Sequence, residues 1–486
     1  MDYTGVLVLI FSFIALLVIG VPIAYSIGIS GILTMLVSID SLPAFTTFAQ
    51  RMATGLDSFA LLAIPFFILA GNIMNSGGIA MRLINLARVL VGRWPAGLAF
   101  VNVFANMLFG AISGSAAAAA SAIGSIMEPE MKKEGYDDNF SAAVNISSAT
   151  TGLSIPPSNT LIVYSLASGG VSITALFLAG YLPGILTGVS IMLTSMCLLV
   201  YQNKGIKGMV FSLLKFIIGT SLIIALGYGV KIAGESSQLL AMLIKVLLVL
   251  CALAYVIYRA KRSPKGALKA LKILWDAVPS LFLLLIVIGG IVAGFFTATE
   301  ASAVAVLYAF VLSLLYKEIK MKDMPAIMLR SVKTTSIVLL LVAACMGLSW
   351  IMAYENIPQT VSATLLSISD NPIVILLMIN LVLLFVGVFM DITPAVLIFT
   401  PIFLPIVTGM GVDPVHFGVI MVMNLSVGLC TPPVGSVLFI GCSVANVKID
   451  KVIKPLLPMF LAMIICLLLV TYLPQISLWL PGVFGF

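Results

Sequence analysis

Residues 151–160 read Thr-Gly-Leu-Ser-Ile-Pro-Pro-Ser-Asn-Thr, a polar, proline-broken stretch inside an otherwise apolar run. Residues 427–436 read Val-Gly-Leu-Cys-Thr-Pro-Pro-Val-Gly-Ser, with the Gly-Leu and Pro-Pro pairs in the same register. Proline breaks a helix, and irregular backbone at membrane depth is tolerated only where protein or a cavity satisfies its polar groups. Two broken helices at matching places in two half-chains are typical of the binding centre of a secondary transporter.

The composition of the chain places these stretches in a membrane protein. Of its 486 residues, 61% are hydrophobic and 9% are charged, whereas about a quarter of a soluble domain is charged. Apolar runs of at least about 18 residues recur along the chain, and each could cross a lipid bilayer. We therefore expect an all-α polytopic membrane protein. The net charge of +7 is better explained by loops that obey the positive-inside rule than by nucleic-acid binding.

The cysteines and the histidine argue against a metal enzyme or a disulfide scaffold. All six cysteines lie in apolar segments without metal-ligand spacing, and His416 is the only histidine. A zinc or disulfide framework is therefore disfavoured, and an intramembrane hydrolase would lack a nucleophile–base pair. A channel is a further alternative, although two hairpins around proline breaks suit alternating access better.

The order of the predicted elements recurs in the two halves of the chain. Each half has spanning helices, an interfacial helix, a re-entrant hairpin of two helices and a broken helix. Ile79 to Ser113 and Ile357 to Asp391 are both 34 positions. In the first half we expect these elements at 5–20, 22–38, 57–75 (after a loop at 44–56), 79–93, 97–130 and 138–170, followed by a span at 173–203. In the second half we expect them at 273–295, 297–316, 336–353, 357–369, 373–408 and 415–446, followed by a span at 455–473.

This recurrence predicts inverted repeats. We assign residues 1–207 to the first repeat, 208–262 to an insertion of two extra spans with a basic loop, and 263–486 to the second repeat. With Lys132 and Lys133 in the cytoplasm, most basic loops fall inside. We expect twelve spans, both termini outside, and two hairpins that enter from opposite faces.

The hairpin turns and helix breaks are the candidate site. Helix N-termini attract anions, whereas carbonyl ends and unwound segments attract cations. Oxygen ligands without thiolate or imidazole suit an alkali ion, and we take this ion to be sodium. We expect sodium ligands among Ser113, Ser115, Gly152, Pro156, Asp391, Thr393, Gly428 and Pro433, and contacts to a small polar solute among Asn145, Ser158, Asn159, Thr160 and Ser436.

Each of these residues also has a structural interpretation. Serine and threonine in membrane helices often donate to a carbonyl one turn earlier or join neighbouring helices. Asp391 is the stronger candidate, because a carboxylate inside the membrane is costly and usually functional. Glu300 could accept hydrogen bonds at a helix start or act in the site. For His416 a structural or interfacial role is favoured over a proton relay.

In its motifs the chain resembles the large membrane subunit (DctM type) of tripartite ATP-independent periplasmic (TRAP) transporters. The resemblance rests on short motifs that follow in order along nearly the whole chain: Gly20-Val-Pro-Ile-Ala24, Ile64-Pro-Phe-Phe-Ile-Leu-Ala-Gly71, Ser113-Gly-Ser-Ala116, Ile155-Pro-Pro-Ser158, Phe296-Thr-Ala-Thr-Glu-Ala301 and Gly428-Leu-Cys-Thr-Pro-Pro-Val-Gly435. It implies an elevator-type, ion-transporter-like fold in which a domain of two hairpins and two broken helices slides against a scaffold.

The resemblance also implies partners and a coupling ion. Family members work with a small four-span membrane subunit and a periplasmic substrate-binding protein, and sodium gradients drive import of a small organic anion across the bacterial or archaeal cytoplasmic (inner) membrane. Three features depart from the usual pattern: the insertion, an alanine at position 119 where the family often has an acid, and Ser158-Asn159-Thr160. The last favours a sugar acid over a C4-dicarboxylate. The alternative in the same class is a sodium/anion symporter that needs no binding protein.

Overall fold

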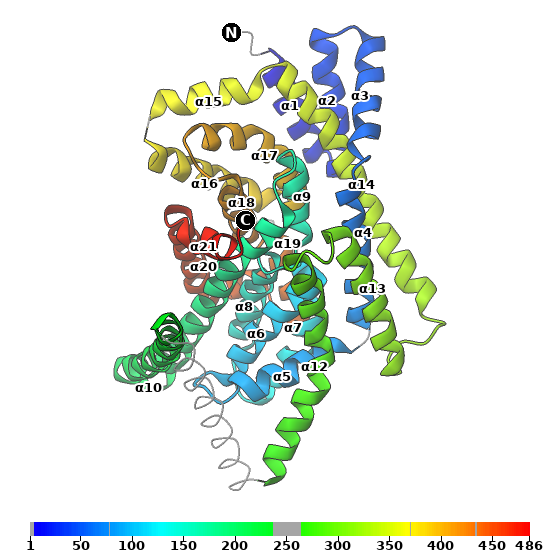
Figure 1. The fold of residues 1–486 in the computed structure, drawn as a ribbon. Helices are drawn as coiled ribbons and strands as arrows, with labels where there is room; N and C mark the ends of the chain where they lie inside the picture. Colours follow the sequence, from blue (N-terminus) through cyan, green and yellow to red (C-terminus); the bar gives the residue numbers. More distant parts are fainter. Residues whose placement is uncertain (1–3, 77, 237–263, 370, 433–434) are drawn as a thin grey trace.

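The computed structural model describes residues 4–76, 78–236, 264–369, 371–432 and 435–486, and in these ranges every regular element is a helix (Figure 1). Eight helices among the described residues are long and apolar enough to cross a membrane. They are Phe59–Ser76, Ile173–Gln202, Leu271–Val292, Ala298–Leu315, Met324–Tyr354, Pro372–Phe389, Ile392–Gly409 and Ile449–Tyr472. The prediction of a polytopic, all-helical membrane protein is therefore confirmed.

One group of helices, which we call the scaffold group, lies mostly along one side of the molecule, while its member α12 runs through the middle of the view toward the bottom (Figure 1). Within it α14 packs against α2, α3 and α4, and α4 packs against α13. The members of the group are α1 (Thr4–Val18), α2 (Ile23–Ser38), α3 (Ser41–Gly55), η1 (Phe59–Leu62), α4 (Ala63–Ser76), α12 (Pro264–Val292), α13 (Ala298–Leu315) and α14 (Met324–Tyr354).

Two expectations for this group were wrong. The expected loop at 44–56 is most of helix α3, because Ala44 and Phe48, one turn apart, form a buried stripe. The ring of Phe48 fills the space beside two glycines: a Cβ on Gly31 would lie 2.9 Å from it, and one on Gly347 would lie 2.5 Å away. The span expected at 336–353 begins earlier, at Met324, because the charged residues of its first turns lie on exposed faces that do not interrupt the helix.

The second group of helices contains the two hairpins and the two broken helices. The first hairpin is α6 (Gly97–Ser113) with α7 (Ala116–Lys133), and the second is α16 (Pro372–Phe389) with α17 (Ile392–Gly409). The first broken helix is α8 (Asp138–Ala149), η2 (Thr151–Leu153) and α9 (Asn159–Ala167), and the second is α18 (Pro414–Gly428) and α19 (Ser436–Ala445). The expected hairpins and breaks are thus present as helices, whereas their inverted relation in a membrane stays a prediction.

The two broken helices begin in the same way, and this explains where the chain turns into them. Asp137 caps α8 by accepting a hydrogen bond from the Phe140 amide at 2.9 Å. Asp413 caps α18 by accepting one from the Val415 amide at 2.7 Å. A carboxylate at the N-cap satisfies an otherwise unpaired donor of the first turn. Helix α8 ends at Ala149 and is followed by the turn η2, which contains the first Gly-Leu pair, whereas α18 ends at the second Gly-Leu pair.

The hairpins and broken helices are interlocked. Helix α7 of the first hairpin packs against α19 of the second broken helix, and α17 of the second hairpin packs against α9 of the first. Each half of the chain therefore completes the environment of the other. The arm helices α5 (Ile79–Val91) and α15 (Ile357–Ile368) connect the scaffold group to the hairpins. The chain closes with α20 (Ile449–Tyr472) and α21 (Gln475–Val483), which both pack on α10.

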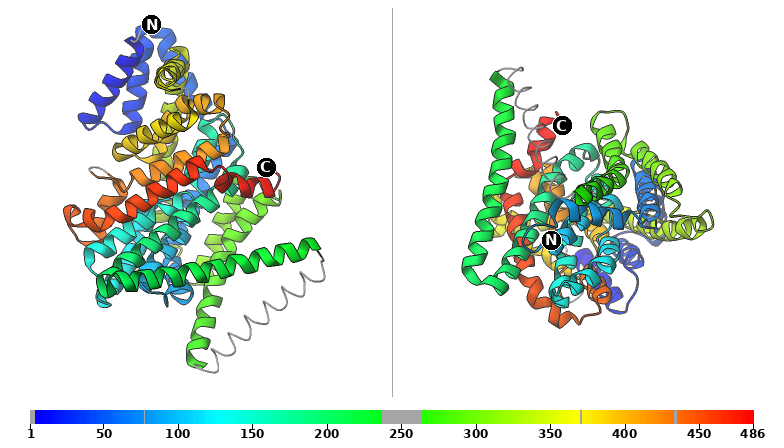
Figure 2. Two further views of the ribbon diagram at one scale, coloured as in Figure 1. Left: turned by 90° about the vertical axis from the view of Figure 1, so that its left-hand side faces the viewer. Right: turned by 90° about the horizontal axis from the view of Figure 1, so that it is seen from below.

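The predicted insertion is described only in part. Helix α10 (Ile173–Ser236) runs through the expected span at 209–228 and departs from helical geometry at Gly205, with a φ of 66° and a ψ of −170°. Figure 2 shows the part after this kink on the outside of the helical body. The second expected span, 238–258, lies outside the described residues, and the domain boundaries at 207 and 262 stay predictions.

Candidate functional site

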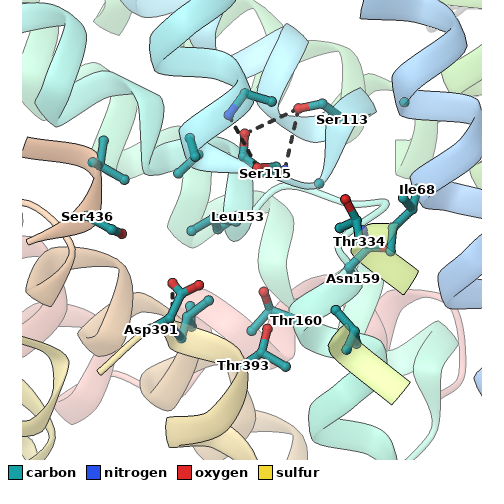
Figure 3. A pocket seen from close by; sticks show the side chains of 18 of the residues that line it. Ile68, Ser113, Ser115, Leu153, Asn159, Thr160, Thr334, Asp391, Thr393 and Ser436 are labelled. Carbon is teal, nitrogen blue, oxygen red and sulfur yellow. Dashed lines mark hydrogen bonds between the residues drawn. The ribbon is translucent and has the colours of Figure 1, made fainter. Parts of the chain in front are cut away.

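A cavity of about 700 Å³ lies where the two hairpin tips meet the scaffold group. Figure 3 shows side chains of both tips around it, together with residues of α9, α14 and α19. Of the predicted site residues, seven line this cavity: Ser113, Ser115, Asn159, Thr160, Asp391, Thr393 and Ser436. Residues as far apart in the sequence as Ser113 and Ser436, which are separated by 323 positions, are thus brought together.

The first tip is built by a tight reversal between α6 and α7. Gly114 has a φ of 62°, a left-handed conformation that glycine adopts at little cost. Ser115 then caps α7, its hydroxyl accepting from the Ala118 amide at 3.3 Å. A Cβ on Gly114 would lie 2.8 Å from Nδ2 of Asn159, so the side-chain amide of Asn159 lies directly against the tip. The reversal therefore brings two serine hydroxyls and one amide to the cavity.

The second tip carries the acid. Asp391 caps α17 and accepts a hydrogen bond from the amide of Ile392 at 3.0 Å. This bond occupies only part of the acceptor capacity of a carboxylate. Asp391 is exposed to the cavity, and Thr393 of the same turn also lines it. The tip can therefore offer carboxylate and hydroxyl oxygens, which are hard ligands suited to an alkali cation.

Four helices begin at this cavity. Its lining includes first-turn residues of α7, α9, α17 and α19, such as Ala116, Asn159, Ile392 and Ser436. Helix N-termini carry partial positive charge and free amides, which favour anions. Ser113, Leu153 and Leu429, at or next to helix C-terminal ends, also line the cavity, and carbonyl ends favour cations. The arrangement can therefore hold a small anion and a cation side by side.

Two predicted substrate contacts do not reach the cavity. Asn145 is buried between α6, α7 and α8, where its side-chain amide donates to the Ala120 carbonyl at 2.8 Å and accepts from Asn106 at 3.0 Å. Ser158 is fully buried; its hydroxyl donates to the Leu153 carbonyl at 2.5 Å and, as the N-cap, accepts from the Leu161 amide at 3.5 Å. Asn145 thus joins α8 to the first hairpin, whereas Ser158 joins the two sides of the break.

The glycines predicted as ligands lie at close packing contacts. A Cβ on Gly152 would lie 2.3 Å from the Cα of Gly110, and a Cβ on Gly428 would lie 2.6 Å from the Cα of Gly387. At each break the backbone therefore crosses the first helix of its own hairpin at a distance only glycine allows. Neither Gly152, Gly428 nor Pro156 is among the cavity-lining residues. Pro433 lies outside the described residues.

Sequence reasoning missed one wall of the cavity. The scaffold group contributes Asn72 and Asn75 of α4 and Arg330 and Thr334 of α14. Asn72 also donates to the hydroxyl of Ser331 at 2.8 Å, which joins α4 to α14. The available signal was a spacing of one turn between polar residues at 330 and 334 in the polar first part of a helix that continues as an apolar span.

Two other candidates are structural. Glu300 closes a capping box, accepting from the amide of Thr297 at 2.8 Å and from its hydroxyl at 2.9 Å. The ring of His416 is buried, with Nδ1 2.6 Å from the hydroxyl of Ser477 and Nε2 3.3 Å from the Thr471 carbonyl. Neither residue lines the cavity.

Comparison with known proteins agrees with this architecture. Residues 10–476 match the family model of the DctM component of tripartite ATP-independent periplasmic transporters. The chain belongs to this family. It is 50% identical over 480 residues to the protein YgiK of Salmonella typhimurium, covering 99% of this chain and 98% of the relative. The resemblance deduced from the motifs is thereby confirmed.

A second relative differs in length. The isethionate TRAP transporter permease protein DctMQ of Oleidesulfovibrio alaskensis is 37% identical over 484 residues, which cover 99% of this chain and 67% of that protein. Among solved structures, the YdaH transporter of Alcanivorax borkumensis has a TM-score of 0.59 at 13% identity, covering 98% of each chain. At this identity the likeness shows the fold alone. The isethionate relative is named as a transporter permease, and the chain is a multi-pass membrane protein of the same family.

Proposed function

We propose that this chain is the large permease subunit of a sodium-coupled importer that takes up a small organic anion, such as a carboxylate or sugar acid. One observation carries the proposal: both hairpin tips and the first turns of α9 and α19 border the same cavity. The helix N-termini and the side chains of Asn159 and Thr160 would bind the anion. Oxygens of Ser113, Ser115, Asp391 and Thr393, with backbone carbonyls at the helix ends, would bind sodium.

The mechanism we infer is an elevator step in which the hairpins and broken helices move as one body against the scaffold group. The interlocking of α7 with α19 and of α17 with α9 supports a single moving body. The cavity lies at the boundary between that body and α4 and α14, where alternating access requires it. We further infer that the two halves are inverted repeats, with both termini outside the cytoplasmic membrane of a bacterium or archaeon.

We also propose that the chain works with a four-span membrane subunit and a periplasmic binding protein. Family membership supports this assembly. The alternative is a sodium/anion symporter that acts without a binding protein. The test is transport by the purified permease in proteoliposomes, with and without the two partners. The acid used in this assay is whichever of isethionate, succinate and gluconate the partner binding protein binds.

Uptake that requires an inward sodium gradient and the binding protein would support the proposal. Sodium-driven uptake that is equally fast without the binding protein would favour the stand-alone symporter. Uptake unaffected by removal of sodium would overturn the coupling. Empty liposomes and liposomes with equal sodium on both sides are the controls.

A further inference from the structure

The scaffold side of the cavity carries a positively charged side chain that forms no ion pair with the described residues of the hairpin tips. Among the described residues that line the cavity, Arg330 carries the positive charge and Asp391 the negative charge. Arg330 lies in the second turn of α14 and is exposed. The ion pairs of the described part of the chain join Arg82 to Glu318, Arg88 to Glu130 and Lys132 to Asp138. The guanidinium of Arg330 therefore has no acidic partner among the described residues.

The position of Arg330 is held firmly relative to the cavity. Arg330, Thr334 and Val338 follow at intervals of one helical turn and all line it, so this face of α14 is turned toward the tips. Ser331, the next residue, is buried and accepts the hydrogen bond from Asn72 at 2.8 Å. That bond fixes the rotation of α14 against α4. The polar wall of Asn72, Asn75, Arg330 and Thr334 is consequently part of the scaffold group.

A guanidinium that faces a cavity and has no acidic partner among the described residues is suited to a planar acidic group. Its fixed fork of donors binds a carboxylate or sulfonate through two parallel hydrogen bonds, which a lysine cannot reproduce. The tips offer helix N-termini to an anion, but Asp391 opposes it there. Arg330 supplies full positive charge on the opposite wall. A bound acid would therefore lie between the tips and α14.

We propose that Arg330 is a substrate-recognition residue that binds the acidic group of the transported anion from the scaffold side. This inference rests on the proposed function. Because Arg330 belongs to the scaffold group, it meets the substrate only when the tips face α14 as they do here. It therefore sets affinity in this state, and the site as a whole is specific for acids.

The electrostatic part is tested without knowledge of the substrate, in the complete complex with the membrane subunit. Thr334→Cys places a thiol on the cavity wall about 6 Å along the helix from Arg330. Its labelling rates with anionic 2-sulfonatoethyl and cationic 2-(trimethylammonio)ethyl methanethiosulfonate are compared by peptide mass spectrometry.

We expect Arg330→Gln to lower the ratio of the anionic to the cationic rate about fivefold. Lys333→Gln, which removes an exposed charge of the same helix that does not line the cavity, is expected to leave the ratio unchanged. An unchanged ratio in Arg330→Gln would overturn the proposal.

The recognition part is tested by counterflow in proteoliposomes with whichever of isethionate, succinate or gluconate the wild-type complex carries. We expect Arg330→Gln to raise KM at least tenfold, Arg330→Lys to raise it less, and the sodium dependence to stay as in wild type. Wild-type KM in Arg330→Gln would overturn this proposal alone. A wild-type complex that carries neither these acids nor any acid that its binding protein binds would instead contradict the proposed function, and the present inference with it.

Discussion

The Cα of Gly110 lies so close to Gly152 that a Cβ on Gly152 would come within 2.3 Å of it. Gly387 and Gly428 repeat this relationship in the second half of the chain, with 2.6 Å for a Cβ on Gly428. Each broken helix is thus fixed to the first helix of its own hairpin at the point where the break begins. The close contact between the two glycine backbones therefore sets the position of each break. The cavity lies beyond the breaks.

Alanine at either crossing glycine should separate the break from its hairpin. Overpacking in a close contact costs about 1–3 kcal/mol, so we expect Gly152→Ala and Gly428→Ala to lower the thermal stability of the purified protein and to reduce uptake strongly. The control is Gly289→Ala in α12, where a Cβ would meet no atom within 4 Å and alanine favours the helix. Equal melting temperatures for the three variants would contradict the packing role.

Thr160 and Ser158, two residues apart, should respond differently to loss of the hydroxyl. Thr160 lines the cavity, so we expect Thr160→Val to raise KM for the anion and leave stability nearly unchanged. Ser158 caps α9 from a buried position, so Ser158→Ala should cost about 1 kcal/mol of stability with little change in KM. Melting curves and uptake kinetics of both variants measure the contrast, and the opposite pattern would contradict the assignment.

The boundary between the scaffold and the moving body can be locked. A Cβ on Gly71 of α4 would lie 3.2 Å from the Cα of Ser113 at the first tip, so cysteines at these two positions can be tested for disulfide formation. We expect Gly71→Cys/Ser113→Cys protein with the disulfide formed to stop transporting. Because Ser113 is a proposed sodium ligand, the reduced protein should recover the rate of the Ser113→Cys single variant rather than that of wild type. Each single cysteine variant is the control. Transport at the same rate in the oxidised and reduced forms would argue against movement at this boundary.

The serine tip should set the sodium requirement. We expect Ser113→Ala with Ser115→Ala to raise the sodium concentration needed for half-maximal uptake, because two oxygen ligands are removed from the first tip. Ser125→Ala, an exposed serine of α7 that bonds the Ala122 carbonyl at 3.0 Å, is the matched control. An unchanged sodium dependence in the double variant would remove the first tip from the ion site.

Much of this architecture could be predicted from the sequence because lipid restricts the choices. The hairpins around Ser113 and Asp391 follow from apolar helices interrupted by small polar turns, which are stable at membrane depth only beside a cavity. The close crossing of Gly110 with Gly152 could not be predicted, because it depends on which helix lies next to the break. Asn145 and Ser158 were misplaced for a related reason: a buried polar residue bonds to protein or lines a cavity, and composition does not distinguish the two.

The cavity-lining residues of the scaffold group were harder to predict from the sequence than the hairpins. Arg330 and Thr334 fall before the purely apolar part of α14, and positive residues there suggest a cytoplasmic loop. In the structure they continue the helix and face the tips. Helix α3 was missed because its buried stripe is narrow and polar residues are interspersed with apolar ones along the segment. In both cases the local hydropathy fits either a loop or a helix, and tertiary contacts determine that the segment is helical.

The central claim, that sodium bound at the second tip drives uptake of the anion, is tested most directly by Asp391→Asn. Asparagine keeps the size and one acceptor of the cap but removes the charge that a cation requires. The measurement is uptake into proteoliposomes under an inward sodium gradient, with membrane insertion and melting temperature of the variant compared with wild type. We expect a folded, inserted protein in which sodium-driven uptake is lost. Wild-type sodium-driven uptake by Asp391→Asn would contradict the account.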